Sequence, residues 1–423
     1  MSNSGVFNSR VFNSRVANNG AASHRRRCKQ NVKKPKVSSR RALPRSMLFG
    51  KLSEDSMELR VTSLPGDGIG PEVTSQAICV LEEVASGFGH DLELDEKEIG
   101  GVALEKFGNP LPDATIQACL ASEAVLLGAV GSQAFDHNPR ELRPEAGLLR
   151  LRQELGAFAN LRPAVFYPSL AGCSPLREEI VSGTDILIVR ELLGGLYFGQ
   201  PRSIEGSPGE RQAINTMRYC EPEIERIARV AFQLARSRRR RVLSVDKSNV
   251  LECSRLWREV VTGIGRDFSD VHLSHMYVDS AAMSLVLKPA EFDVILTENM
   301  FGDILSDEVG GVVGSLGLLA SASIGGPVGI YEPVHGSAPD IAGQGVANPL
   351  GAILSVALML RHTFHLPKEA ECVEAGVIST LMGGFRTRDL ARRGERTVST
   401  EEMGAQIAEF VRLAANTKSR AAS

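Results

Sequence analysis

This 423-residue sequence lacks closely spaced cysteine pairs and long apolar runs, and each absence excludes a class of protein. The seven cysteines form no CxxC pair and no framework spacing, which argues against a structural zinc site and against a secreted disulfide scaffold. No apolar run reaches the roughly 18 residues that span a bilayer, so we expect no membrane partner. What is abundant is apolar residues, at 43%, and glycine, with 41 copies, which predicts a folded protein of two or three lobes.

Acidic residues are absent from the first 53 positions, which hold 13 Lys and Arg. The whole chain has a formal net charge of −2, so removing these 13 positive charges leaves −15 for residues 54–423. A basic leader rich in Ser and Asn is typical of organelle import, and we predict a disordered targeting leader (transit peptide) over residues 1–56. A nucleic-acid-binding arm is the alternative, but the acidic remainder offers nucleic acid no second surface. The expected location is the plastid (chloroplast) stroma, with the mitochondrion as the alternative.

Short apolar runs alternate with amphipathic stretches from residue 57 onward. The run 59–64 is typical of a strand, and the apolar spacing after Pro71 is typical of a helix that stops near Gly87. Further strand-like runs follow at 124–130, 185–190, 242–246 and 292–297. This alternation predicts an α/β fold with a mostly parallel central sheet.

A glycine-rich turn, Gly66-Asp67-Gly68-Ile69-Gly70, separates the first strand from the first helix. It is not the dinucleotide fingerprint GxGxxG, because its third glycine comes one residue too early. A tight turn is the simpler interpretation. If NAD binds, other residues must hold most of it.

One predicted helix carries Glu145, Leu148, Leu149 and Arg152 on a single face. A carboxylate, two leucines and a guanidinium are an unusual core stripe, although a plain amphipathic surface helix has the same spacing.

Two more arginines, Arg162 and Arg190, stand near the ends of predicted strands, where a scaffold usually places ligand contacts. Guanidinium groups bind carboxylates through paired hydrogen bonds, so these two together with Arg152 suit a small substrate with two or three carboxylates. Each arginine taken alone is more often part of a surface ion pair.

Asp303 and Asp307 are four residues apart, and on one helical face two carboxylates repel each other unless a cation lies between them. Mg²⁺ or Mn²⁺ is the natural partner for an all-oxygen site, and a like-charged solvated face is the alternative. Asp279 could supply a third carboxylate. Lys247 follows an apolar strand, where desolvation can lower the pKa of a lysine into the range of a general base, although both residues also suit exposed strand ends.

A loop rich in Gly, Ser and Pro follows at 332–343 and leads to Asn348. A plain surface loop is one interpretation, but this one is too apolar and too regular in its turn residues for a flexible linker. We do not assign its single histidine, His335, as a catalytic base.

From about Leu59 to the end of the chain, these motifs together resemble the isocitrate/isopropylmalate family of β-decarboxylating dehydrogenases, and within it the members that act on 3-isopropylmalate. They occur in family order: LPGDGIGPEV, EAGLLRLR, FANLRP, IVRELLGGLYFG, SVDKSNVLE, YVDS, FGDILSD and EPVHGSAPDIAG. The resemblance implies an isopropylmalate dehydrogenase-like two-domain fold that is not a Rossmann fold. It places a cofactor-binding domain at 57–157 and 314–423, and a substrate, metal and dimerisation domain at 158–313.

The resemblance also implies a role for each matching residue. Tyr197 and Lys247 are the expected catalytic pair, and NAD and Mg²⁺ or Mn²⁺ are the expected cofactors. Lys247 and Asp279 are expected to reach the site from the neighbouring subunit of a homodimer. The expected ligand sets are Glu145, Leu148, Leu149, Arg152, Arg162, Arg190 and Asp279 for the substrate, Asp279, Asp303 and Asp307 for the metal, and His335, Gly336, Ser337, Ala338, Asp340, Ile341 and Asn348 for the cofactor.

The implied activity is oxidation and decarboxylation of 3-isopropylmalate with NAD, a step of leucine biosynthesis. Leu148 and Leu149 can bury an isopropyl group, worth on the order of 2 kcal/mol. Asp340 favours NAD, because its carboxylate would repel a 2′-phosphate. Isocitrate, homoisocitrate and tartrate are alternative substrates, and a non-catalytic regulatory subunit is the alternative role.

Four positions depart from the usual family pattern, namely Glu298, Gly310, Gly311 and Ala320. We expect the double glycine to fray the helix that carries Asp307.

Overall fold

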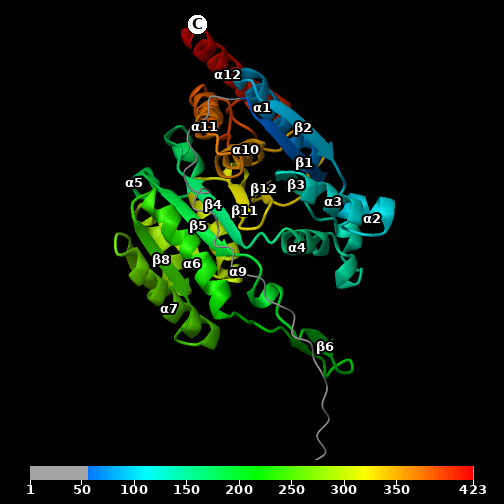
Figure 1. Cartoon of the computed structure of the whole chain (residues 1–423), viewed down its shortest axis with the longest axis vertical. Helices are drawn as coiled ribbons and strands as arrows, with labels where there is room; N and C mark the ends of the chain where they lie inside the picture. Colours follow the sequence, from blue (N-terminus) through cyan, green and yellow to red (C-terminus); the bar gives the residue numbers. More distant parts are fainter. Residues whose placement is uncertain (1–55, 423) are drawn as a thin grey trace, which may run out of the picture. The chain divides into compact units, whose positions relative to one another are not determined.

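The computed structural model describes residues 56–422 (Figure 1). The predicted targeting leader, residues 1–56, lies outside the described residues except for its last position. In the part of the chain that the structure describes, no helix combines the length and hydrophobicity that a membrane span requires.

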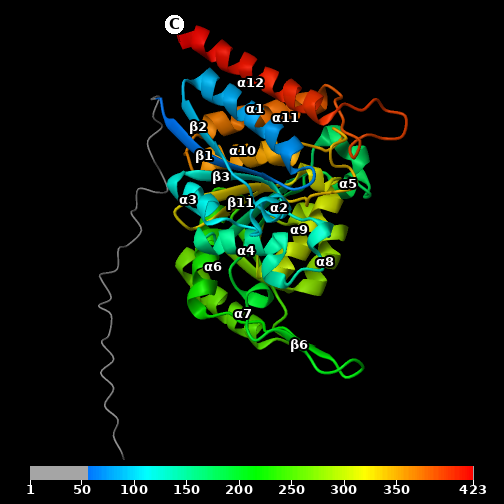
Figure 2. The same cartoon turned by 90° about the vertical axis from the view of Figure 1, so that its right-hand side faces the viewer.

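A ten-stranded mixed sheet lies at the centre of the described part (Figures 1 and 2). Six of its nine strand pairings are parallel, and the three antiparallel ones all involve β4 or β11. This confirms the predicted α/β fold with a mostly parallel sheet, and the antiparallel centre distinguishes it from a Rossmann fold. The strands in spatial order are β2 (Asp91–Glu96), β1 (Glu58–Gly66), β3 (Ala124–Ala129), β12 (Gly329–Pro333), β11 (Ala320–Ile324), β4 (Ala159–Val165), β5 (Asp185–Glu191), β10 (Val294–Thr297), β8 (Arg241–Asp246) and β9 (His272–Tyr277).

Helices cover both faces of this sheet (Figures 1 and 2). One face is covered by α1 (Gly70–Phe88), α6 (Glu221–Arg236), α7 (Glu252–Gly265) and α10 (Leu350–His362). On this side α11 (Pro367–Met382) packs against α10, and α12 (Thr400–Ala422) packs against α1 and α11. The other is covered by α3 (Asp113–Ala121), α4 (Pro144–Glu154), α8 (Val278–Leu287) and α9 (Asn299–Val313). The short helices α2 (Gly101–Phe107) and α5 (Glu178–Val181) lie in connections between strands.

The apolar strand runs of the sequence are explained by burial on both faces. In β5, Leu187 and Val189 pack into the core beneath α6, whereas Ile186 and Ile188 pack into the core beneath α8 and α9. A strand buried on both sides has no polar face, so its sequence does not alternate. Such strands hold the residues that follow them in fixed positions.

A small separate hairpin, β6 (Ser203–Glu205) paired with β7 (Gln212–Ile214), extends away from the large sheet (Figure 2). Its apolar side chain Ile204 is 68% exposed. An isolated two-stranded hairpin is marginal in water by itself.

The expected fraying of the helix that carries Asp307 was wrong. The helix α9 continues through Gly310 and Gly311 to Val313. A side chain at position 310 would come within 2.8 Å of Leu316, so this glycine allows the close approach of the segment after the helix. Ala320, another departure from the family pattern, is the buried first residue of β11.

Candidate active site

Two buried arginines contact the carboxylate of Asp303, and a third arginine lies nearby. Arg190 Nη1 of β5 lies 2.5 Å from Asp303 Oδ1, and Arg162 Nη1 of β4 lies 3.4 Å from the same atom. Arg152, in the last turn of α4, pairs instead with Glu332 at 2.7 Å. The structure therefore brings the three predicted substrate arginines into one region, from three different elements.

Burial makes these positive charges costly. It lowers the pKa of Arg190 to about 10, and the neighbouring charge of Arg162 adds to the effect while Asp303 opposes it. Burial also lowers the pKa of Arg162. Both guanidinium groups are still protonated at neutral pH, and a buried charge of this kind favours binding of an anion.

Asp303 and Asp307 project from one face of α9 toward these arginines. The Tyr197 hydroxyl donates to Asp303 Oδ2 at 2.7 Å, and Arg162 Nη1 lies 3.7 Å from Asp307 Oδ1. Burial would raise the pKa of Asp303, but the charges of Arg190 and Arg162 outweigh it and hold the pKa below its usual range. Burial raises the pKa of Asp307, and Asp303 adds to the rise while Arg162 opposes it. A divalent cation beside the two carboxylates would relieve this repulsion, so the donor set suits Mg²⁺ or Mn²⁺.

Tyr197 ends the short helical turn Gly195–Tyr197 that follows β5. Burial and the hydrogen bond to Asp303 raise the pKa of Tyr197 to about 12. The guanidinium carbon of Arg190 lies 5.6 Å from the centre of its ring. A tyrosine held in this way keeps its proton at neutral pH and can donate it.

Lys247 and Asp279 form a separate pair. Lys247 follows β8, Asp279 lies in the first turn of α8, and their Nζ and Oδ1 atoms are 2.7 Å apart. Among the described side chains, no three His, Cys, Asp or Glu residues lie close enough together to hold a metal ion. Within one chain, Asp279 therefore does not join Asp303 and Asp307. A site shared between two copies of the chain would need an exposed Asp279, and its side chain is 64% exposed.

The residues predicted to share one face of α4 contact different surroundings in the structure. Glu145 and Leu149 line a cavity of about 510 Å³ together with Tyr197, whereas Leu148 packs against the core under β3. The same cavity is lined by Arg140, whose guanidinium donates to the Tyr197 carbonyl oxygen at 3.2 Å. Of the two leucines, Leu149 is thus the one placed to touch a ligand beside Tyr197.

The predicted cofactor loop forms one wall of a cavity of about 590 Å³. Five of the seven predicted cofactor residues line it: His335, Ala338, Asp340, Ile341 and Asn348. Gly336 and Ser337 do not. The cavity is also lined by residues outside the predicted cofactor set, namely Ile69, Ser315, Gly317, Gln344, Val346, Ala347, Arg388 and Asp389. Asp389 accepts hydrogen bonds from Ser315 Oγ at 2.5 Å and from Asn348 Nδ2 at 3.0 Å, so it orders this wall of the cavity.

The glycine-rich turn after β1 is a structural junction. The Asp67 carboxylate accepts hydrogen bonds from the backbone N–H groups of Gly101, Val102 and Gly131. The backbone of Ile69 donates to the Ser337 carbonyl oxygen at 2.8 Å. The turn thus joins β1 to the cofactor loop, in agreement with its interpretation as a tight turn.

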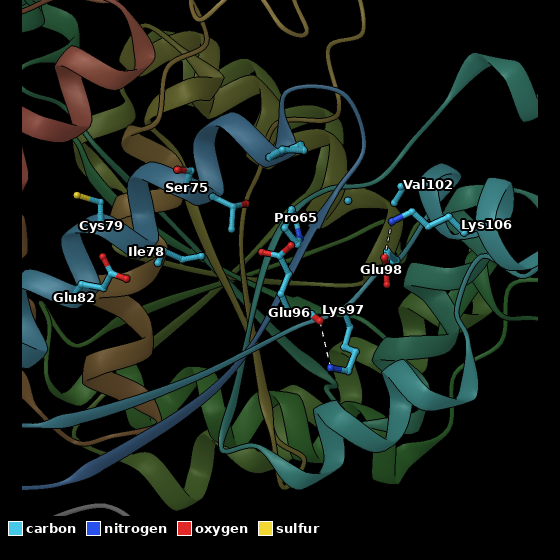
Figure 3. Close-up of a pocket in the computed structure, with 13 residues that line it drawn as sticks. Pro65, Ser75, Ile78, Cys79, Glu82, Glu96, Lys97, Glu98, Val102 and Lys106 are labelled. Atoms are coloured by element: carbon cyan, nitrogen blue, oxygen red, sulfur yellow. Dashed lines mark hydrogen bonds and ion pairs between the residues drawn. The ribbon is translucent and has the colours of Figure 1, made fainter.

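A further cavity, of about 480 Å³, lies between the ends of β1 and β2 and the helices α1 and α2 (Figure 3). An ion pair between Lys106 and Glu98 crosses one side of it, with Glu82 and Glu96 on other sides. None of the predicted site residues lines this cavity.

Three buried polar residues beside the site were not predicted to support it. Asn160 and Asn299, both fully buried, accept hydrogen bonds from Arg162 and Arg190 respectively. Glu298, noted only as a departure from the family pattern, is the N-cap of α9 and accepts from the backbone N–H groups of Met300 and Phe301. Their sequence signal was their position, directly before or within the motifs that supply the charged residues.

Replacing Glu298 with alanine is expected to lower the free energy of unfolding by about 1–3 kcal/mol, because α9 loses its cap and the Tyr219 hydroxyl loses an acceptor. Urea titration followed by circular dichroism measures the change. Glu298→Gln, which keeps a carbonyl acceptor, is expected to lose less. Equal losses in the two variants would show that the charge of Glu298, rather than the cap, stabilises the helix.

Comparison with known proteins gives a consistent match. The model of the family described as isocitrate/isopropylmalate dehydrogenase matches residues 60–407. The chain belongs to the isocitrate/isopropylmalate dehydrogenase family. The 3-isopropylmalate dehydrogenase of Nitratidesulfovibrio vulgaris is 56% identical over 357 residues, which cover 84% of this chain and 100% of that protein. The enzyme of the same name from Aquifex aeolicus is 51% identical over 350 residues, covering 83% and 96%.

Solved structures of the family share the fold. An isocitrate dehydrogenase from Methylococcus capsulatus has a TM-score of 0.76 at 35% identity, covering 84% of this chain and 99% of that chain. A β-decarboxylating dehydrogenase from Thermococcus kodakarensis has a TM-score of 0.67 at 34% identity, covering 84% and 96%. These matches confirm the predicted family, the fold and the kind of enzyme.

The predicted location was wrong. Relatives at 51–56% identity come from bacteria such as Nitratidesulfovibrio vulgaris, Aquifex aeolicus and Pseudomonas fluorescens, which contradicts a plastid or mitochondrial assignment. The inference depended only on the basic composition of the leader, and a basic composition is also compatible with other roles.

Proposed function

We propose that this chain oxidises and decarboxylates 3-isopropylmalate to 4-methyl-2-oxopentanoate with reduction of NAD, a step of leucine biosynthesis. The observation that carries the proposal is the meeting of Arg162 and Arg190 at Asp303, beside a cavity lined by Leu149. It is supported by relatives of 51–56% identity that are named 3-isopropylmalate dehydrogenase. The enzyme is an NAD-dependent, metal-dependent oxidoreductase.

When bound, NAD would supply the hydride acceptor, and Mg²⁺ or Mn²⁺ would supply a Lewis acid for the oxygen atoms of the substrate. Asp303 and Asp307 would hold the cation, with Asp279 of a second copy as the third ligand. His335, Ala338, Asp340, Ile341 and Asn348 would hold the adenosine part of NAD in their cavity, with Gly336 and Ser337 shaping the loop.

The three arginines bind and orient the carboxylates. Arg152, Arg162 and Arg190 are fixed by buried partners, so the substrate meets donors that are already in place. Tyr197 keeps its proton next to Arg190 and would deliver it to the carbon that loses carbon dioxide. Lys247 of a second copy would take the proton of the substrate hydroxyl.

A shared site requires a homodimer, which we propose from the exposed apolar side chains of two neighbouring helices. Met283 and Leu287 of α8 are both 61% exposed and Ile304 of α9 is 58% exposed. Their position next to Asp279 and Asp303 would place the second copy beside the metal ligands. The exposed hairpin arm with Ile204 would add a second contact.

We also propose two functional lobes. Residues 57–157 and 314–423 would bind the cofactor, since the cavity lined by Asp340 and Asn348 belongs to them. Residues 158–313 would provide most substrate, metal and dimer contacts, since they hold Arg162, Arg190 and the α9 aspartates.

A panel of 2-hydroxy acids tests the substrate. The purified full chain with Mg²⁺ and NAD is expected to reduce NAD with a kcat/KM for 3-isopropylmalate that is at least tens-fold above those for isocitrate, homoisocitrate and tartrate. Leu149→Ala is expected to lower kcat/KM for 3-isopropylmalate about tenfold, because an isopropyl contact is lost. A preference for isocitrate would overturn the substrate assignment. No NADH with any of the acids would favour a regulatory subunit.

A further inference from the structure

Two of the buried substrate arginines rest on buried asparagines. Arg162 Nε donates to Asn160 Oδ1 at 2.8 Å. Arg190 donates to Asn299 Oδ1 from Nε at 3.1 Å and from Nη2 at 2.7 Å. In both cases the Nε side of the guanidinium is occupied, and the Nη1 atom is directed toward Asp303.

The remaining hydrogen-bonding groups of both amides are also used. Asn160 Nδ2 donates to Ser321 Oγ at 2.8 Å and to Ser323 Oγ at 2.9 Å. Asn299 Nδ2 donates to the carbonyl oxygens of Leu192 at 2.9 Å and Gly194 at 3.1 Å. An amide bonded through both its oxygen and its nitrogen cannot turn over without breaking several hydrogen bonds, so each asparagine is a fixed acceptor.

The choice of an amide is notable because several other arginines of the described chain pair with buried carboxylates. Arg226 pairs with Glu191, and Arg258 pairs with Asp246, and both acids are almost fully buried. A carboxylate would orient a guanidinium as well as an amide does, but it would also add a negative charge next to it. An amide orients the arginine without adding a negative charge beside it.

We propose that Asn160 and Asn299 are positioning residues, which set the orientation of Arg162 and Arg190 while adding no negative charge to the pocket for the substrate carboxylates. The inference rests on the proposed function, because it assigns those two arginines to a dianionic acid. It adds a reason for the residue type: an amide at these positions favours binding of the dianion, and an acid would oppose it.

Asn160 is the better position for a test. In Asn160→Asp, Oδ1 still accepts from Arg162, and the hydroxyl groups of Ser321 and Ser323 can reverse and donate to the new oxygen. In Asn299→Asp, the new oxygen would face two carbonyl oxygens that cannot donate. Asn160→Asp therefore changes charge with little change in shape or hydrogen bonding.

The experiment compares the full-length Asn160→Asp variant with the unmodified chain. The KM for 3-isopropylmalate is expected to rise about tenfold or more, while the KM for NAD and the melting temperature in the absence of ligand stay close to their original values. The rise in melting temperature on adding 3-isopropylmalate with Mg²⁺ is expected to shrink. A merely structural role would lower the melting temperature and leave the KM for the acid unchanged.

The matched control is Gln233→Glu, which adds the same charge to an exposed position on α6 and is expected to leave both KM values unchanged. If Asn160→Asp does not fold, the smaller and uncharged Asn160→Ser removes the acceptor and is expected to raise the same KM. A folded variant with an unchanged KM for the acid would overturn this inference alone. An unmodified chain that makes no NADH from 3-isopropylmalate would overturn the proposed function and the inference with it.

Discussion

Replacing Lys247 with alanine is expected to lower kcat by a factor on the order of 10³, because the substrate hydroxyl loses its proton acceptor. The KM for NAD should stay unchanged, since Lys247 does not line the cavity of the cofactor loop. Steady-state measurement of NADH formation with 3-isopropylmalate and Mg²⁺ gives both constants. Lys288→Ala, which removes an exposed lysine from the end of α8, is the matched control and should retain full activity.

The same variant tests the sharing of sites between subunits. Co-expression of Lys247→Ala with Arg190→Met is expected to restore about a quarter of the original activity. About half of the randomly formed dimers contain one chain of each kind. In each of these dimers one site carries both changes and the other site carries neither. If both changes affect the same chain's own site, the mixture will be no more active than its components. That result would contradict the homodimer with shared sites, although it would leave the role of Lys247 as a base intact.

Arg190→Met is expected to have the second large effect. Methionine fills much of the same space but removes a buried charge and its hydrogen bonds to Asp303 and Asn299. The loss of about 2–5 kcal/mol of transition-state binding corresponds to a decrease of roughly thirtyfold to several-thousand-fold in kcat/KM for 3-isopropylmalate.

Two observations separate this effect from a general loss of structure. The KM for NAD is expected to stay the same in Arg190→Met. Arg236→Met, which removes an exposed ion pair with Asp270, is the control and is expected to leave kcat/KM unchanged. A decrease of less than about tenfold in Arg190→Met would show that Arg190 supports Asp303 and does not bind the substrate.

Much of the fold and part of the site could be predicted because the relevant signals are local. Apolar runs such as 185–190 predicted strands, and the four-residue spacing of Asp303 and Asp307 predicted a shared helical face. The meeting of Arg162 with Arg190 could be anticipated only through the resemblance to a known family. Nothing in the spacing of the two residues predicts that β4 pairs with β5 in an antiparallel direction.

The parts that could not be predicted depend on packing between distant segments. Leu148 and Leu149 are adjacent and chemically identical, and only the position of α4 on the sheet decides that Leu149 lines the cavity. The roles of Asn160 and Asn299 depend on hydrogen bonds to side chains that were predicted for other reasons. The effect of Gly310 was misjudged, because a glycine that weakens an isolated helix can still be required by a neighbouring segment.

The contact of Asp303 with both Arg162 and Arg190 has a consequence for affinity. Without a bound acid, this aspartate takes the place of a substrate carboxylate, so both buried guanidinium groups have a negatively charged partner. Arrival of a dianion is then an exchange of one carboxylate for another, and its net gain is smaller than the sum of the new contacts suggests. The same exchange would free Asp303 Oδ1 for a divalent ion, while Oδ2 still accepts from Tyr197, so binding of the acid and binding of the ion would be coupled.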